Sequence, residues 1–199
     1  NDRSEVMTST VNSFNEWDSL EEVIVGDCFN FNIPDPELSF NKFFHDNIYK
    51  YTPYNFQGKL FDKKYIEETQ EDLQGLADVL DKLGIIVKRP KKLDKYLHFS
   101  TPYWKSTCSA PYNVRDQAII IGDEIIETSP MVRCRYFEND LLKQVFYEYF
   151  KKGAKWTCSP RPMLLDNSFD LSYIQKQGID TQKDYPTSDS EFDVGYEIM

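Results

Sequence analysis

The chain has 199 residues, of which 40% are hydrophobic and 15% aromatic, so it can bury a sizeable core and is not expected to be disordered throughout. Its formal net charge is -10 and its pI is about 4.7. An acidic surface repels phosphate backbones, so nucleic-acid binding is not expected. No window approaches the roughly 18 apolar residues that a membrane-spanning helix needs.

The first half of the chain predicts a strand, a long loop, a helix and a second strand. Residues 20–26 end in a β-branched run closed by a glycine, which is typical of a buried strand. Residues 27–63 are rich in Asn, Phe, Tyr and Pro without a period, which indicates a long loop of the kind that often carries function. Apolar residues at helical spacing predict a helix over 64–83, and a glycine separates it from a strand over 85–87.

The second half predicts a hairpin, a helix and a further strand. Residues 117–121 and 124–127 are β-branched runs, and the Gly122-Asp123 dipeptide between them is typical of a two-residue hairpin turn. An amphipathic helix is predicted over 137–151, with Phe150 among its buried residues, and the next strand follows after a glycine.

Both halves have the order strand, helix, Gly, strand, Pro, at a spacing of roughly 70 residues. A helix followed by Gly and a strand is common in α/β proteins, but the repetition suggests α/β modules arranged about an axis. The tail from 175 to 199 is polar and rich in Asp, and it ends within a new apolar run, where a domain is not expected to finish.

Cysteines, histidines and clustered lysines are the first residues to consider for nucleophilic, acid–base or metal chemistry. The cysteines form no C-x-x-C pair and fit no zinc pattern, so we expect four reduced, partly buried thiols: Cys28, Cys108, Cys134 and Cys158. His45 and His98 lie among Phe, Tyr and Asn, and both are expected to be loop residues rather than an acid or a base. The lysines after Pro90 indicate a solvated loop: Lys91, Lys92 and Lys95.

Asp116 follows Asn113-Val114-Arg115 and directly precedes a predicted strand. A carboxylate at the edge of a buried strand needs a partner or solvent. One interpretation, which the pattern alone favours, is a loop residue that caps a turn or pairs with Arg115. The other is a carboxylate directed into a cleft, where it binds a guanidinium group, because Asp and Glu match the planar, two-pronged geometry of that cation.

Arg133-Cys134-Arg135 lies just before the second predicted helix. An attacking cysteine needs a lowered pKa, which neighbouring arginines or a helix N-terminus supply, so Cys134 is a candidate nucleophile. The stretch contains no histidine. The pattern therefore favours a structural cysteine whose neighbouring arginines pair with acidic residues.

Several of these stretches together resemble the amidinotransferase family, which includes arginine:glycine amidinotransferase and the inosamine-phosphate amidinotransferases. They occur in the family's order and with similar spacing across residues 11–170. The stretches are Val11–Gly26, Thr101-Pro102, Asn113–Asp116, Ile121–Glu127, Arg133–Glu138 and Gly153–Pro162. The first, the hairpin and the last are the most specific.

This resemblance implies an α/β fold, a partial pentein-type α/β propeller built from ββαβ modules, with residues 1–199 forming the N-terminal part of one amidinotransferase domain. It implies transfer of the amidino group of L-arginine to an acceptor amine through an amidino-cysteine intermediate, without a metal or an organic cofactor. It assigns binding of the substrate guanidinium to Asp116. The family's catalytic Asp, His and Cys would lie beyond Met199, so no catalytic residue and no metal site is expected in this chain.

The implied partners are two small molecules, L-arginine and an acceptor amine, and a homo-oligomer is compatible with the resemblance. The 27–63 loop departs from the glycine-specific enzymes, so the acceptor stays open among glycine, lysine, an inosamine and another amine. A cytoplasmic location is expected, or a mitochondrial one if a targeting segment preceded Asn1. Two alternatives remain, an arginine deiminase-like guanidino hydrolase and a non-catalytic binding or assembly module. A partial ring exposes apolar edges, so the chain alone is expected to self-associate and to be inactive.

Overall fold

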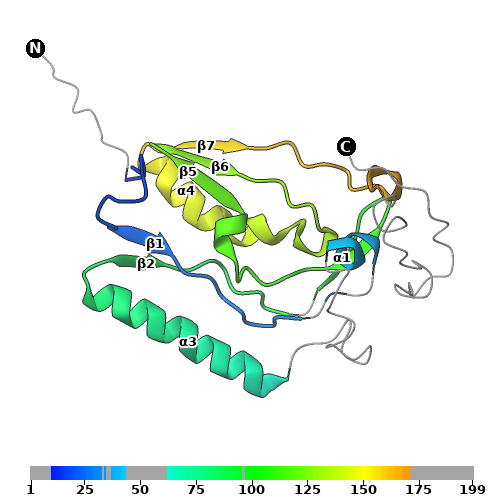
Figure 1. Cartoon of the computed structure of the whole chain (residues 1–199), viewed down its shortest axis with the longest axis horizontal. Helices are drawn as coiled ribbons and strands as arrows, with labels where there is room; N and C mark the ends of the chain where they lie inside the picture. Colours follow the sequence, from blue (N-terminus) through cyan, green and yellow to red (C-terminus); the bar gives the residue numbers. More distant parts are fainter. Residues whose placement is uncertain (1–9, 33, 35–36, 44–61, 96, 171–199) are drawn as a thin grey trace, which may run out of the picture.

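The computed structural model describes residues 10–32, 34, 37–43, 62–95 and 97–170, which form a mixed α/β structure (Figure 1). A three-stranded sheet has the order β5-β6-β7, and two further pairs of strands are β1-β2 and β3-β4. The α/β class predicted from the sequence is confirmed. No helix within the described ranges is long and apolar enough to cross a membrane.

The predicted hairpin is present and carries the three-stranded sheet. β5 (Ala118–Ile121) and β6 (Glu124–Glu127) pair antiparallel, with Ile121 opposite Glu124 across the two-residue turn. Gly122 in this turn has φ 58°, a left-handed conformation that glycine adopts without steric cost. β7 (Lys155–Cys158) follows α4 (Lys143–Lys151) and pairs parallel with β6.

The first half repeats this parallel pairing. β1 (Glu22–Ile24) and β2 (Ile86–Lys88) are parallel, with Val23 opposite Val87, and α3 (Lys63–Lys82) lies between them in sequence. The Asp62 side chain caps α3 by accepting from the backbone N–H of Lys64 at 2.9 Å. Both halves thus contain two parallel strands joined through a helix, as the repeated sequence pattern predicted.

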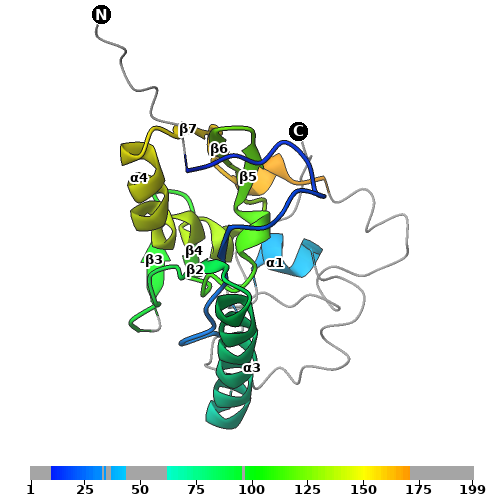
Figure 2. The same cartoon turned by 90° about the vertical axis from the view of Figure 1, so that its left-hand side faces the viewer.

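The main core forms where α4 and the residue before it pack against β6 and β1. Leu142, Val145 and Phe146 are buried there against Ile125 of β6, and Ile24 of β1 packs at the edge of the cluster. The β1–β2 pair lies between α3 and α4 in both views (Figures 1 and 2).

The helix predicted over 137–151 is correct in place but not in detail. Its first turns are a separate 3-10 helix, η4 (Glu138–Leu141), and only the rest is α-helix. Phe150, predicted to be buried, is 52% exposed, whereas Tyr149 is buried and its hydroxyl donates to Glu22 of β1 at 2.9 Å. The polar end of Tyr149 therefore supplies a contact that a hydrophobic pattern does not indicate.

The interpretation of 27–63 as a loop is wrong for one described segment. Residues Leu38–Phe43 form the short helix α1, and most of the remaining loop, 44–61, lies outside the described residues, together with the 171–199 part of the polar tail. The sequence also did not predict the hairpin of β3 (His98–Ser100) and β4 (Lys105–Thr107).

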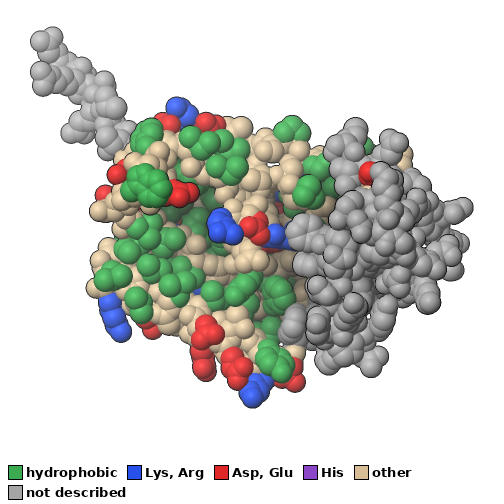
Figure 3. Space-filling model, in the orientation of Figure 1, with side chains coloured by type: hydrophobic (Ala, Val, Ile, Leu, Met, Phe, Trp, Pro, Cys, Tyr) green, Lys and Arg blue, Asp and Glu red, His purple; other side chains and the backbone are tan. Residues whose placement is uncertain are grey.

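Several large apolar side chains lie on the surface. α3 fully buries only Ala77, while Leu76 on this helix and Leu83 at its C-terminal cap are half or more exposed. Trp17 is 85% exposed and Ile121, at the end of β5, is 60% exposed. Figure 3 shows hydrophobic side chains gathered on this face over β1–β2 and α3.

Candidate functional site

Asp116 lies at the open end of the β5–β6 hairpin, opposite the turn. It is the last residue of the 3-10 helix η2 (Val114–Asp116), and only Gln117 separates it from β5. Thr128, just after β6, donates its hydroxyl to the Asp116 carbonyl oxygen at 2.6 Å, and its N–H donates to the Gln117 carbonyl at 3.0 Å. The two chain segments that leave the hairpin are therefore held together beside the Asp116 side chain.

The Asp116 carboxylate pairs with an arginine, although not with the neighbour that the sequence suggested. Nη1 of Arg135, in the 3-10 helix η3 (Arg133–Arg135), lies 2.9 Å from Oδ2. Pairing with Arg115 was therefore the wrong expectation. The Asp116 side chain is 40% exposed, and no described residue donates a hydrogen bond to Oδ1.

Arg135 is held from its other side by Glu138. Nε of Arg135 lies 2.6 Å from Oε2 and Nη2 lies 3.0 Å from Oε1, a two-pronged contact, and the Glu138 side chain is 1% exposed. Burial lowers the pKa of Arg135, but the hydrogen bonds and charges of Glu138 and Asp116 raise it by more, so the guanidinium stays protonated. Nη2 also lies 3.3 Å from the Asn113 carbonyl oxygen.

The three side chains Asp116, Arg135 and Glu138, here called the acidic triad, carry two negative charges and one positive charge. The triad is left with one net negative charge and one carboxylate oxygen to which no described residue donates a hydrogen bond. Such a group attracts a cation, and a planar guanidinium matches a carboxylate better than a compact ammonium does. The geometry is therefore compatible with the second interpretation of Asp116, as a guanidinium-binding residue.

The four cysteines are all free thiols, as predicted, and three of them are buried. Burial raises the pKa of Cys134 to about 12 and that of Cys108 to about 11. Burial also raises the pKa of Cys28 and of Cys158, with further contributions from Asp27 and Glu127 respectively. An attacking cysteine needs a lowered pKa, so the structure supports the interpretation of Cys134 as a structural residue.

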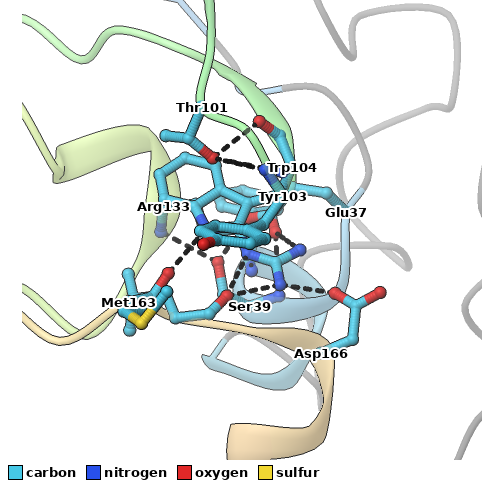
Figure 4. A network of polar contacts seen from close by, with 10 residues as sticks. Glu37, Ser39, Thr101, Tyr103, Trp104, Arg133, Met163 and Asp166 are labelled. Carbon is cyan, nitrogen blue, oxygen red and sulfur yellow. Dashed lines mark hydrogen bonds and ion pairs between the residues drawn. The ribbon is translucent and has the colours of Figure 1, made fainter.

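The other arginine of the Arg133-Cys134-Arg135 stretch is also paired, in a buried network (Figure 4). Arg133 is 1% exposed and donates to the Leu164 carbonyl, to Asp166, and to Glu37 at 3.5 Å. Its guanidinium carbon lies 5.3 Å from the centre of the Trp104 ring. The predicted pairing of these arginines with acidic residues is confirmed, but the partner Glu37 lies 96 residues away and gave no signal in the sequence.

The remaining candidates lie apart from this chemistry or outside the described residues. His98 is an exposed residue of β3, a strand rather than the predicted loop, and His45 is not among the described residues. The lysines after Pro90 are exposed, as predicted: Lys91, Lys92 and Lys95. Across the described part of the chain, no three His, Cys, Asp or Glu side chains are grouped to hold a metal ion.

Comparisons with known proteins connect this structure to a group of enzymes. No family model matches the chain. It is 35% identical over 171 residues to the mitochondrial glycine amidinotransferase of Xenopus tropicalis, covering 84% of this chain and 40% of that protein. It is 34% identical over 161 residues to inosamine-phosphate amidinotransferase 1 of Streptomyces griseus, covering 81% of this chain and 46% of that protein.

Solved structures give the same relationship. The Streptomyces griseus inosamine-phosphate amidinotransferase superposes with a TM-score of 0.73 at 34% identity, covering 81% of this chain and 46% of that one. An amidinotransferase of the saxitoxin biosynthetic pathway from Microseira wollei superposes with a TM-score of 0.74 at 35% identity, with the same coverage.

The fold and these comparisons define the class, a mixed α/β chain related to transferases. Within that class the resemblance to the amidinotransferase family is confirmed, since the relatives in both sequence and structure are amidinotransferases. The chain spans less than half the length of the curated relatives it matches.

Proposed function

We propose that the protein is an amidinotransferase that moves the amidino group of L-arginine to an acceptor amine. In the first half-reaction, a cysteine thiolate attacks the guanidinium carbon and the catalytic histidine donates a proton to the arginine Nε; the bond from the carbon to Nε then breaks and ornithine leaves as a neutral amine. In the second, the nitrogen of the acceptor amine attacks the amidino carbon and the thiolate departs. A proton moves from the attacking amine to the catalytic base.

The observation that carries this proposal is the acidic triad, in which Oδ1 of Asp116 accepts no hydrogen bond from any described residue. Asp116 presents Oδ1 to the guanidinium of the substrate while Oδ2 stays with Arg135. A carboxylate in this role holds the guanidinium close to the nucleophile through its charge and one hydrogen bond. The relatives of this chain are named for amidino transfer, and that chemistry requires a site for a guanidinium group.

The attacking cysteine and its catalytic Asp and His partners belong, in this proposal, to protein sequence beyond the 199 residues. All four cysteines of the chain have raised pKa values, which is the opposite of an activated nucleophile. Residues 1–199 would then form the N-terminal part of one pentein-type domain. The two parallel strand pairs, each joined through a helix, are in keeping with successive modules of such a propeller.

The acceptor amine and the compartment are not fixed by these observations. Glycine, lysine and an inosamine are the acceptors to test first, because the relatives include both glycine and inosamine-phosphate amidinotransferases. Cytoplasmic and mitochondrial locations both stay predictions, and the vertebrate relatives are named as mitochondrial.

The test uses the full-length protein, L-arginine and these amines, with ornithine and citrulline measured separately. We expect ornithine to form over many turnovers only when an acceptor amine is present, with no more than one equivalent per active site without it, and no citrulline. Asp116→Asn should lower kcat/KM for arginine by about a hundredfold, the size expected when a bound cation loses its charged partner. The matched control is Asp123→Asn, another exposed aspartate, whose 3.1 Å pair with Lys155 lies at the hairpin turn.

Each alternative predicts a different result. Citrulline formation without an amine would support a guanidino hydrolase, and absence of both products would support a non-catalytic module. Equal activity of the Asp116→Asn and Asp123→Asn variants would remove Asp116 from the site. The 199-residue chain alone should form no product, and turnover by it would show that the nucleophile had been wrongly placed outside it.

A further inference from the structure

The Arg135 guanidinium is held in place through all three of its nitrogens, although its side chain is 24% exposed. Nε and Nη2 contact Glu138, Nη1 contacts Asp116, and Nη2 also approaches the Asn113 carbonyl. Its guanidinium therefore has one orientation, set by a glutamate that is 1% exposed. Because Oδ2 of Asp116 accepts a hydrogen bond from this fixed group at 2.9 Å, the range of orientations open to the Asp116 carboxylate is restricted as well.

The net charge of the acidic triad depends on Glu138 as well as on Asp116 and Arg135. A carboxylate bonded only to Arg135 forms a neutral pair, and a neutral pair has little attraction for a cationic substrate. The structure contains a second acidic residue, Glu138, on the far side of the same guanidinium. Burial, and to a smaller extent the charge of Asp116, raise the pKa of the Glu138 carboxyl, while the hydrogen bond and charge of Arg135 and a hydrogen bond from Gln117 offset part of that effect. The two-pronged contact is that of an ionised carboxylate with a guanidinium.

We propose that Glu138 and Arg135 are positioning residues of the guanidinium site: Arg135 orients the Asp116 carboxylate, and Glu138 cancels the charge of Arg135 so that the site keeps one net negative charge. This inference rests on the proposed function, because it concerns the same substrate cation. Neither side chain is required to touch the substrate. Arg135 uses its nitrogens on protein groups, and Glu138 lies behind it, away from solvent.

The proposal is tested by comparing a charged ligand with a neutral one of the same shape. L-Citrulline has a neutral urea group where L-arginine has a guanidinium, so its inhibition constant reports shape without charge. For each variant of the full-length enzyme, the Michaelis constant for L-arginine is divided by the inhibition constant for L-citrulline. A change in shape or packing moves both constants, whereas a change in net charge moves their ratio.

Two substitutions should move this ratio in opposite directions. Glu138→Gln makes the triad neutral, and we expect the ratio to rise about tenfold, the size expected for one charge at short range in a partly buried site. Arg135→Met leaves two negative charges, and the ratio should fall several-fold, even though kcat decreases because Asp116 is less well oriented. The Glu138→Gln, Arg135→Met double variant restores one negative charge, so its ratio should return to within about threefold of the wild type.

Arg135→Lys separates orientation from charge. It keeps the net charge but not the two-pronged contact, so it should lower kcat/KM for arginine while leaving the ratio near the wild-type value. Thermal unfolding of each variant shows whether it is folded. If Glu138→Gln does not fold, the opposite shift in Arg135→Met and the unchanged ratio in Arg135→Lys still test the proposal.

The results distinguish this inference from the proposed function. A wild-type enzyme with no amine-dependent transfer would overturn the proposed function itself. An active enzyme that depends on Asp116, but whose ratio moves in the same direction in Glu138→Gln and Arg135→Met, would overturn only the positioning roles. The Asp123→Asn control should leave both constants unchanged, because that residue is at the opposite end of the hairpin.

Discussion

The buried guanidinium of Arg133 gives a strong prediction about stability. Its Nε and Nη2 donate to the Leu164 carbonyl at 3.0 and 2.6 Å, and its Nη1 lies 3.5 Å from Glu37. Arg133→Met fills much of the same space but removes every one of these donors. Breaking a buried ion pair by removing one partner costs about 3–5 kcal/mol, and we expect a loss of that size. Urea-induced unfolding at neutral pH measures it, provided that the slope of the transition is unchanged.

Arg161→Met is the matched control. Arg161 also lies over aromatic rings, at 5.6 Å from that of Tyr136, and pairs with Asp140 at 3.0 Å, but its side chain is 23% exposed. An ion pair of this kind contributes about 0–1 kcal/mol, so the control should be nearly as stable as the wild type. Equal losses in the two variants would refute the role given to burial.

A second substitution tests which buried group is left without its partner when Arg133 is replaced. Burial raises the pKa of Glu37, and hydrogen bonds from Ser39 together with the charge of Arg133 offset part of this. Without Arg133 the ionised form becomes more costly, whereas glutamine resembles the protonated acid. The Glu37→Gln, Arg133→Met variant should therefore be more stable than Arg133→Met alone. No recovery would place the cost at the other partners of Arg133, the Leu164 carbonyl and the Asp166 carboxylate, instead.

Three further predictions follow from local features. Gly26→Ala should strongly lower the urea midpoint of unfolding, because an added Cβ would lie 2.0 Å from the Tyr112 carbonyl oxygen. Gly75→Ala on α3 should stabilise the protein by about 0.5–1 kcal/mol, because a Cβ there would meet no atom within 4 Å and alanine favours the helix. In the folded 199-residue chain one thiol, that of Cys158, should react first with a thiol reagent and four should react in urea, because the other three are buried; a second thiol reacting equally early in the folded chain would contradict this. The 199-residue chain alone should self-associate through its exposed apolar surface, and a monodisperse monomer in ultracentrifugation would count against that expectation.

The parts of the fold that were predictable from sequence are those with a clear local cause. The helix α3 has a long apolar period and a glycine at its end, and the β5–β6 hairpin has a glycine in the left-handed turn position. The β3–β4 hairpin has three-residue strands of mixed polar and aromatic residues, too short to show an alternation. The helix α1 has six residues, and its place next to η3 depends on long-range contacts to Arg133.

The same distinction applies to the candidate site. A resemblance singled out Asp116, but its partner Arg135 lies 19 residues away and is brought near only when the hairpin closes. Glu138 follows Arg135 by three residues, yet sequence spacing alone does not show that it faces the guanidinium rather than solvent. Long arginine side chains cross between segments, so their partners depend on tertiary structure more than on local pattern.

The net charge of the acidic triad consequently depends on side chains from three short helical segments rather than on one residue. Asp116 ends η2, Arg135 ends η3 and Glu138 begins η4. If Glu138 pointed elsewhere, the same aspartate would be part of a neutral pair, and a match to a sequence motif would not make it a cation-binding group. The orientation of Glu138 therefore determines whether Asp116 attracts a guanidinium. The Michaelis constant for L-arginine divided by the inhibition constant for L-citrulline measures this effect of charge.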